Sequence, residues 1–178
     1  GVEEISLTES HNRVLAEDVR ASLDIPPFNR STVDGYAVKA EDTFGAEENK
    51  PATLEIIGTV IAGELPRISI NKHAAAEIVT GAPMPDGADA TVMVEDTEKT
   101  DDELHVYSAV TKGENVMKAG SDIGKGEIIL KRGQTLGSRQ IGLLAAIGMA
   151  KATVYRVPRV AILSTGAEVT EPGKELPP

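Results

Sequence analysis

The sequence predicts a mostly β fold with some α-helix, an α+β arrangement in which a barrel-like β module is inserted into a split α+β module. Short apolar runs separated by Gly and Pro turns fill residues 37–116, which is typical of a small barrel or sandwich. Residues 139–147 form the one stretch with the composition of a longer helix. Aromatic residues make up 3 % of the chain and Trp is absent, so the core must be built from Val, Ile, Leu and Ala.

The split module is expected at residues 1–24 and 119–157. It begins with a short apolar strand at 5–7, after which Thr8 can cap a brief helix over 9–14. Further strands of this module are expected at 15–22, 127–130 and 152–157.

The helix at 139–147 is expected to begin at Ser138, a good N-cap residue, and to end at Gly148. It carries Ala, Leu and Ile on nearly every face. This composition predicts that the helix is well buried.

The inserted β module is expected at residues 25–118. Pro26 and Pro27 lack the N–H groups that a ladder needs, so no regular strand is expected at 25–28. The strands that we expect after this loop lie at 54–61, 76–79, 90–94 and 104–110.

The last residues, 158–178, have a different character. Pro158 ends the preceding strand, and the apolar run 160–163 is expected to form a new strand that leads into Ser164, Thr165 and Gly166. We interpret this segment as the truncated start of a separate α/β domain. Because the chain begins with Gly1 and stops just after this run, we expect an excised piece of a longer protein in which the segment is poorly anchored.

Composition excludes several classes of function. The net charge is −10, which disfavours both a nucleic-acid surface and docking on anionic membranes. The chain contains no Cys, so disulfides and thiolate metal sites are excluded, and its three His residues have no metal-ligand spacing. A cytoplasmic protein with neither nucleic-acid nor membrane partners is the simplest interpretation.

Four turn-rich motifs beside apolar runs supply the candidate site residues. They contain Asp34, Thr80, Asp122 and Glu168. Gly and Pro fix such turns, so the side chains beside them are aimed, and three carboxylates with a hydroxyl favour metal-bridged phosphate or oxyanion chemistry. Each residue alone has a simpler explanation, such as an Asx-type turn at Asp34 or a solvated loop acid at Glu168.

These motifs together resemble the molybdopterin molybdenumtransferase family, called MoeA in bacteria and archaea and the gephyrin E domain in animals. Residues 27–38, Pro-Phe-Asn-Arg-Ser-Thr-Val-Asp-Gly-Tyr-Ala-Val, are close to the family pattern PPFDNSAMDGYAV. Further matches follow in the same order at 63–64, 78–85, 87–90, 120–123 and 164–168. The resemblance covers essentially the whole chain and implies the complex fold of the MoeA N-terminal region, with residues 1–24 and 119–157 as a dimerisation module. It also implies that residues 158–178 are the truncated start of an α/β molybdopterin-binding domain.

The resemblance implies insertion of molybdate, or tungstate, into adenylylated molybdopterin with the help of Mg²⁺ and with release of AMP. It places catalytic roles on Asp34, Thr80, Asp122 and Glu168, and Mg²⁺ binding on the three carboxylates among them. It places cofactor contacts on the following residues: Ser31, Thr32, Ser164, Thr165 and Gly166. A homodimer is implied as well, and the 178 residues alone are expected to be inactive.

Two departures from the family pattern affect the details of the site. The usual Asp-Asn-Ser is Asn29-Arg30-Ser31 here, and one acid of Thr-Gly-Asp-Glu-Leu is replaced by Ala167. A second hypothesis remains open, namely a non-catalytic scaffold or binding module like the gephyrin branch. The regions that follow in the family would distinguish the two functions.

Overall fold

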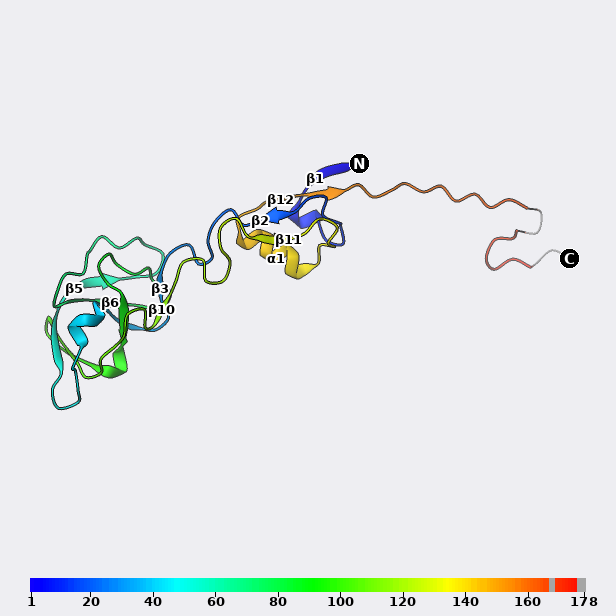
Figure 1. Cartoon of the computed structure of the whole chain (residues 1–178). Helices are drawn as coiled ribbons and strands as arrows, with labels where there is room; N and C mark the ends of the chain where they lie inside the picture. Colours follow the sequence, from blue (N-terminus) through cyan, green and yellow to red (C-terminus); the bar gives the residue numbers. More distant parts are fainter. Residues whose placement is uncertain (167–168, 176–178) are drawn as a thin grey trace.

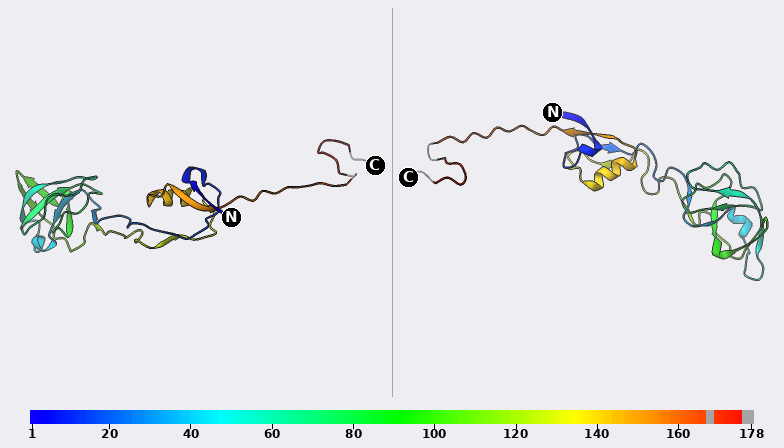
Figure 2. Two further views of the ribbon diagram at one scale, coloured as in Figure 1. Left: turned by 90° about the horizontal axis from the view of Figure 1, so that it is seen from above. Right: turned by 180° about the vertical axis from the view of Figure 1, so that it is seen from behind.

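The computed structural model describes residues 1–166 and 169–175 and shows two modules joined by two segments of chain that run side by side (Figure 1). An isolated bridge between Ile25 and Ile123 lies in this connection. Views from above and behind show the same separation of the modules (Figure 2). The predicted fold class is confirmed, because the chain is mostly β with a single α-helix among the described residues.

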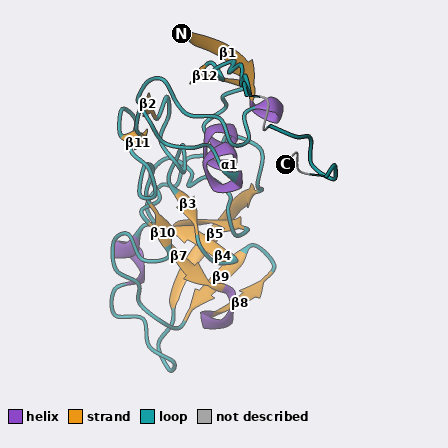
Figure 3. Cartoon of the chain, turned by 90° about the vertical axis from the view of Figure 1, so that its right-hand side faces the viewer, coloured by secondary structure: helices purple, strands orange, loops and turns teal. Residues whose placement is uncertain are grey.

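The larger module is a curled six-stranded sheet with the strand order β7-β4-β6-β5-β9-β8 (Figure 3). Its strands are β4 (Gly35–Val38), β5 (Ala52–Val60), β6 (Ala74–Ile78), β7 (Ala90–Met93), β8 (Thr97–Thr100) and β9 (Glu103–Val106). The β5–β6 pair is parallel, and the other pairs of this sheet are antiparallel. A parallel pair needs a long crossover, and residues 61–73 provide it. Two 3₁₀ turns, η2 (Ala40–Thr43) and η3 (Val94–Asp96), complete the module.

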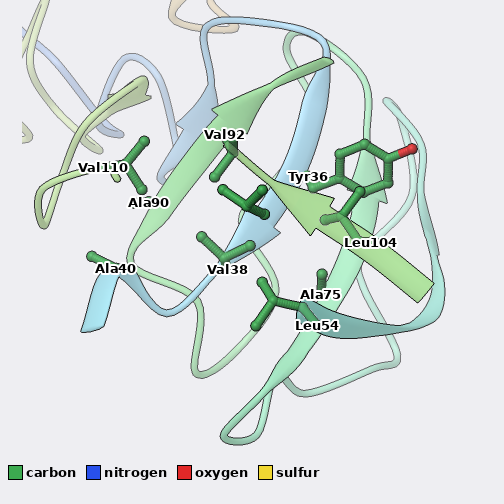
Figure 4. Packing of buried hydrophobic residues seen from close by; sticks show 10 residues of the cluster. Tyr36, Val38, Ala40, Leu54, Ala75, Ala90, Val92, Leu104 and Val110 are labelled. Carbon is green, nitrogen blue, oxygen red and sulfur yellow. The ribbon is translucent and has the colours of Figure 1, made fainter. Parts of the chain in front are cut away.

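Apolar side chains cover both faces of the central strands. On β4, Tyr36 and Val38 join one cluster, whereas Ala37 between them joins a second cluster on the opposite face. The first cluster contains the side chains drawn in Figure 4. The second includes Ile70 of the crossover and Ile78 of β6. Because both faces are buried, these strands are continuous apolar runs rather than alternating ones.

The smaller module combines both ends of the split chain. Strand β1 (Val2–Ser6) pairs with β12 (Lys151–Tyr155), and β2 (Val19–Arg20) pairs with β11 (Ile128–Leu130). A third small ribbon, formed by β3 (Arg30–Ser31) and β10 (Val116–Met117), lies where the connection meets the sheet module.

Helix α1 (Ser138–Ala146) packs on the small module with one face only. Leu144 is fully buried, whereas Gly142, Ala145 and Ala146 are exposed. The expectation of a well-buried helix is therefore wrong, because this module provides a single layer for the helix to pack on. Gly137, rather than Ser138, is the N-cap residue, and its N–H donates to Gln140 Oε1 at 3.2 Å. Gly148 follows the helix with φ of 82°, as expected for a helix end.

Three expected elements are absent or shortened in the structure. In place of a helix over 9–14 there is a 3₁₀ turn, η1 (Leu7–Glu9), capped by Ser6, and Asn12 has a φ of 63° that ends helical geometry. The strand expected at 15–22 is reduced to β2, because residues 16–18 turn away between an isolated bridge and the β2 pair.

The third of these elements is the strand expected at 160–163, which is absent. In the described part of the tail this run has no pairing partner, and Val160, Ile162 and Leu163 are 76 %, 87 % and 86 % exposed. A strand needs a neighbour to satisfy its backbone groups, so the run stays extended without regular pairing (Figure 1). None of the helices in the described ranges has the length and apolarity needed to cross a bilayer.

Replacing Gly35 by Ala is expected to destabilise the sheet module by about 3 kcal/mol or more. A Cβ at this position would lie 1.9 Å from the backbone carbonyl oxygen of Val92, which strand pairing holds in place. Gly124→Ala is the matched control, because no atom lies within 4 Å of its added Cβ. Urea unfolding monitored by circular dichroism measures both; equal stability of the two variants would contradict the steric argument.

Candidate functional site

One end of the six-stranded sheet gathers the loops that carry the candidate residues. Strand β4 lies between β6 and β7, and its first residue, Gly35, stands opposite both Ile78 and Met93. The residue before Gly35 and the residues after Ile78 and Met93 therefore meet at this end. Strand β5, which runs parallel to β6, ends at the same edge, where Val60 pairs with Ile78.

Asp34 and Thr80 form the centre of this end of the sheet. The backbone N–H and the hydroxyl of Thr80 both donate to Asp34 Oδ1, at 2.7 Å and 2.9 Å. The backbone hydrogen bond first, and the hydroxyl second, hold the pKa of the Asp34 carboxyl below its ordinary value. Asp34 is thus an ionised, oriented carboxylate on an exposed surface, and its Oδ2 makes no hydrogen bond to the described residues.

The loop around Ser31 is joined to the loop after Thr80 by backbone hydrogen bonds. Ser31 N–H donates to Ala82 O at 3.0 Å, and Gly81 N–H donates to Ser31 O at 2.9 Å. The Ser31 hydroxyl is buried and donates to Val33 O at 2.7 Å. It therefore shapes its own loop, whereas the neighbouring Thr32 is exposed.

A pocket of about 250 Å³ opens beside the Asp34–Thr80 pair. The residues that line it are Arg30, Ser31, Thr32, Thr80, Gly81 and Met117. The sequence motifs did not by themselves indicate a role for Arg30 or Met117. The departure Asn29-Arg30-Ser31 was a signal for Arg30, because it adds a positive charge to the motif. Nothing in the local sequence indicated Met117, which reaches the pocket through the pairing of β10 with β3.

The other predicted residues lie elsewhere in the chain. Asp122 is in the connection between the modules, where its N–H donates to Ile25 O at 2.9 Å. Ser164, Thr165 and Gly166 belong to the extended, exposed segment after β12. Glu168 lies outside the described residues. Of the predicted set, the structure thus brings together Asp34, Thr80, Ser31 and Thr32.

Mg²⁺ suits the donor chemistry of Asp34 and Thr80, although the described residues hold no cluster of three or more His, Cys, Asp or Glu side chains. Mg²⁺ is commonly held by one or two carboxylates, with waters and substrate phosphates completing its octahedron. The open Oδ2 of Asp34 and the acceptor lone pairs of the Thr80 hydroxyl are oxygen ligands of this kind. The pair fits a site that is completed by substrate.

Comparison with known proteins gives one consistent result. Residues 1–148 match the profile of the MoeA N-terminal region (domain I and II). The chain is 38 % identical over 174 residues to a Mycobacterium tuberculosis protein named molybdopterin molybdenumtransferase 2, covering 98 % of this chain and 43 % of that protein. It is 39 % identical over 174 residues to the Staphylococcus epidermidis molybdopterin molybdenumtransferase, covering 98 % of this chain and 42 % of that protein.

A solved structure agrees with these relatives. The molybdopterin biosynthesis MoeA protein from Pyrococcus horikosii superposes with a TM-score of 0.93 at 47 % identity, over 100 % of this chain and 46 % of that one. The chain therefore spans less than half the length of the proteins it matches.

Thr80→Val is expected to raise the pKa of Asp34 part of the way to its ordinary value, because it removes the hydroxyl donor and keeps the backbone one. In the wild type, the stabilisation from ionised Asp34 is present above the ordinary carboxyl pKa and is lost as the pH falls through the lowered one. A carboxyl ¹³C NMR titration measures the shift. Thr80→Ser retains the donor and should titrate like the wild type; an unchanged Asp34 titration in Thr80→Val would refute the assigned cause.

Proposed function

The chain belongs to the MoeA family, whose N-terminal region it matches, and we propose that it is part of an enzyme that inserts molybdate into adenylylated molybdopterin with release of AMP. The structural observation that supports this proposal most strongly is the hydrogen-bonded Asp34–Thr80 pair at the end of the sheet. The names of the relatives support the activity. Because the chain covers less than half of their length, the remaining substrate contacts are assigned to regions beyond these residues.

In this proposal Thr80 is a positioning residue and Asp34 is the acid that it orients. Two donors on Oδ1 keep the carboxylate ionised and fix its plane, so that Oδ2 is directed outward without reorganisation. Bound Mg²⁺ would neutralise charge on the phosphate bridge of the adenylylated substrate. Asp34 Oδ2 would hold this ion or accept a hydrogen bond from water at the bridge.

Asp122 and Glu168 are proposed to complete the acid set, and Ser31, Thr32, Ser164, Thr165 and Gly166 to contact the cofactor. Thr32 is exposed and available for such a contact, whereas the buried Ser31 hydroxyl acts by supporting the loop. Because the described segment 158–166 is extended and exposed, its residues can reach the site only when the rest of the protein positions them. We accordingly expect no activity from the 178 residues alone. We also propose a cytoplasmic location, since a Cys-free chain needs no oxidising compartment.

Asp34→Asn is expected to lower molybdate insertion about a hundredfold, equivalent to about 3 kcal/mol, in a protein that carries this chain together with the remaining length of its relatives. Asn keeps the size and turn preference of Asp but loses the charge. AMP release and thermal melting should be measured on the same preparation. Asp101→Asn, in a turn with φ of 53°, is the matched control and should retain activity.

Two results would reject the assignment of Asp34. Wild-type activity in Asp34→Asn would show that Asp34 serves only to form the turn. A large fall in melting temperature would make its role structural.

We further propose that the protein forms a homodimer through the small module, with helix α1 contributing its exposed small residues Gly142, Ala145 and Ala146. Ala145→Glu places a charge on this face without touching the monomer core, and it should convert the full-length dimer into a monomer with an unchanged melting onset. Sedimentation velocity at micromolar concentration is the measurement. A wild type that sediments as a monomer, or a variant that remains dimeric, would contradict the proposed interface.

A further inference from the structure

We propose that Arg30 is the anion-recognising residue of the pocket beside Asp34 and Thr80, and that this pocket takes a tetrahedral oxyanion. The oxyanion would be either a phosphoryl group or a free metal oxyanion such as molybdate. This inference deepens the proposed function. It rests on that function only in deciding which of the two anions is the physiological ligand.

The place of Arg30 in the pocket follows from the loop and strand that carry it. Arg30, Ser31 and Thr32 line the same pocket as Thr80. The preceding residue, Asn29, lines a different pocket together with Lys118. The pairing of Arg30 with Met117, and the isolated bridge of Arg30 to Pro83, hold Arg30 in this place from two sides.

The charge of Arg30 is not neutralised by the part of the chain that the structure describes. Its Nη2 contacts Met117 Sδ at 3.2 Å, and a thioether is only a weak acceptor. The arginine ion pairs found in the described ranges involve Arg13 and Arg156, but not Arg30. A half-buried arginine without an acidic partner is notable in a chain with 28 acidic residues. Its charge is available for a ligand.

The size of the pocket favours a small group over a whole cofactor. Its volume of about 250 Å³ is below the ~300–1,000 Å³ of typical small-molecule sites. The guanidinium offers a planar fork of donors that matches two oxygens of a phosphate-like anion. The exposed Thr32 hydroxyl is a further donor at the rim. An apolar ligand would cover the guanidinium without giving it a hydrogen-bond acceptor, and a cation would be repelled by its charge.

Arg30 also resolves an electrostatic conflict at the site. Asp34 is ionised and would repel an oxyanion, but it is not among the residues that line the pocket. Thr80 lines the pocket together with Arg30 and also donates its N–H and hydroxyl to Asp34, so the pocket and the carboxylate share this residue. The anion would sit on the Arg30 side, and a cation or a water on the Asp34 side.

Direct binding tests this assignment without any enzyme assay. Inorganic phosphate, molybdate and AMP are titrated separately into the 178-residue chain at low ionic strength by isothermal calorimetry, since salt screens exposed charges. The variants are Arg30→Gln, Arg30→Lys and Arg67→Gln. Arg67 is exposed in the crossover and lines a different pocket, so it matches the charge change of Arg30→Gln outside the site. Thermal melting checks that each variant is folded.

We expect saturable 1:1 binding in the wild type. Arg30→Gln should bind the anion with an affinity lower by about tenfold or more, and Arg30→Lys should have an intermediate affinity. The affinity of Arg67→Gln should stay within about twofold of the wild type, because its charge change lies outside the pocket. Tighter binding of molybdate identifies the free oxyanion as the ligand, and tighter binding of AMP identifies a phosphoryl group. The proposal is overturned if no probe binds saturably, if a folded Arg30→Gln binds like the wild type, or if both Gln variants lose affinity equally. Inactivity of the full-length enzyme with intact anion binding would reject the proposed reaction and leave the role of Arg30 standing.

Discussion

The close packing of strand β4 between β6 and β7 is the constraint on which the rest of this structure depends. Gly35 stands opposite Ile78 and Met93 at once, and the backbone carbonyl of Val92 occupies the space of a side chain there. This contact fixes where β4 begins, and so it fixes the position of Asp34. Strand β6 ends beside it, which brings the Thr80 N–H within 2.7 Å of the Asp34 carboxylate. Backbone pairing, rather than side-chain packing, therefore builds the site.

The charges at the site follow from the same pairing. In a chain of net charge −10, the proposed anionic substrates need a local positive charge. The β3–β10 ribbon carries Arg30, which lines the same pocket as Thr80. Thr80 donates a hydrogen bond to the Asp34 carboxylate and also lines the pocket that contains Arg30. Phosphate chemistry assisted by a divalent ion requires a cation and an anion next to each other, as we propose for Asp34 and Arg30.

Local patterns predicted the elements that depend on local sequence. The runs at 76–79 and 90–94 correspond to β6 and β7 because Gly and Pro turns bound them, and Gly148 marks the end of α1. The helix expected at 9–14 failed because Asn12 turns left-handed to meet Leu136, a contact 124 residues away in sequence. The hydrogen bond between Asp34 and Thr80, and the place of Arg30 in the pocket, depend on strand register between distant segments. Periodicity contains no such information.

Paramagnetic relaxation tests the central claim, that this end of the sheet binds a divalent ion and an anion together, most directly. Mn²⁺ is added to the ¹⁵N-labelled chain in the presence of pyrophosphate, and the broadening of each amide signal is followed. We predict broadening centred on the amides of Thr32, Asp34 and Thr80 that weakens when pyrophosphate is omitted. Broadening centred on the acidic turn at Asp101 and Asp102, with the Thr80 amide unaffected, would contradict it.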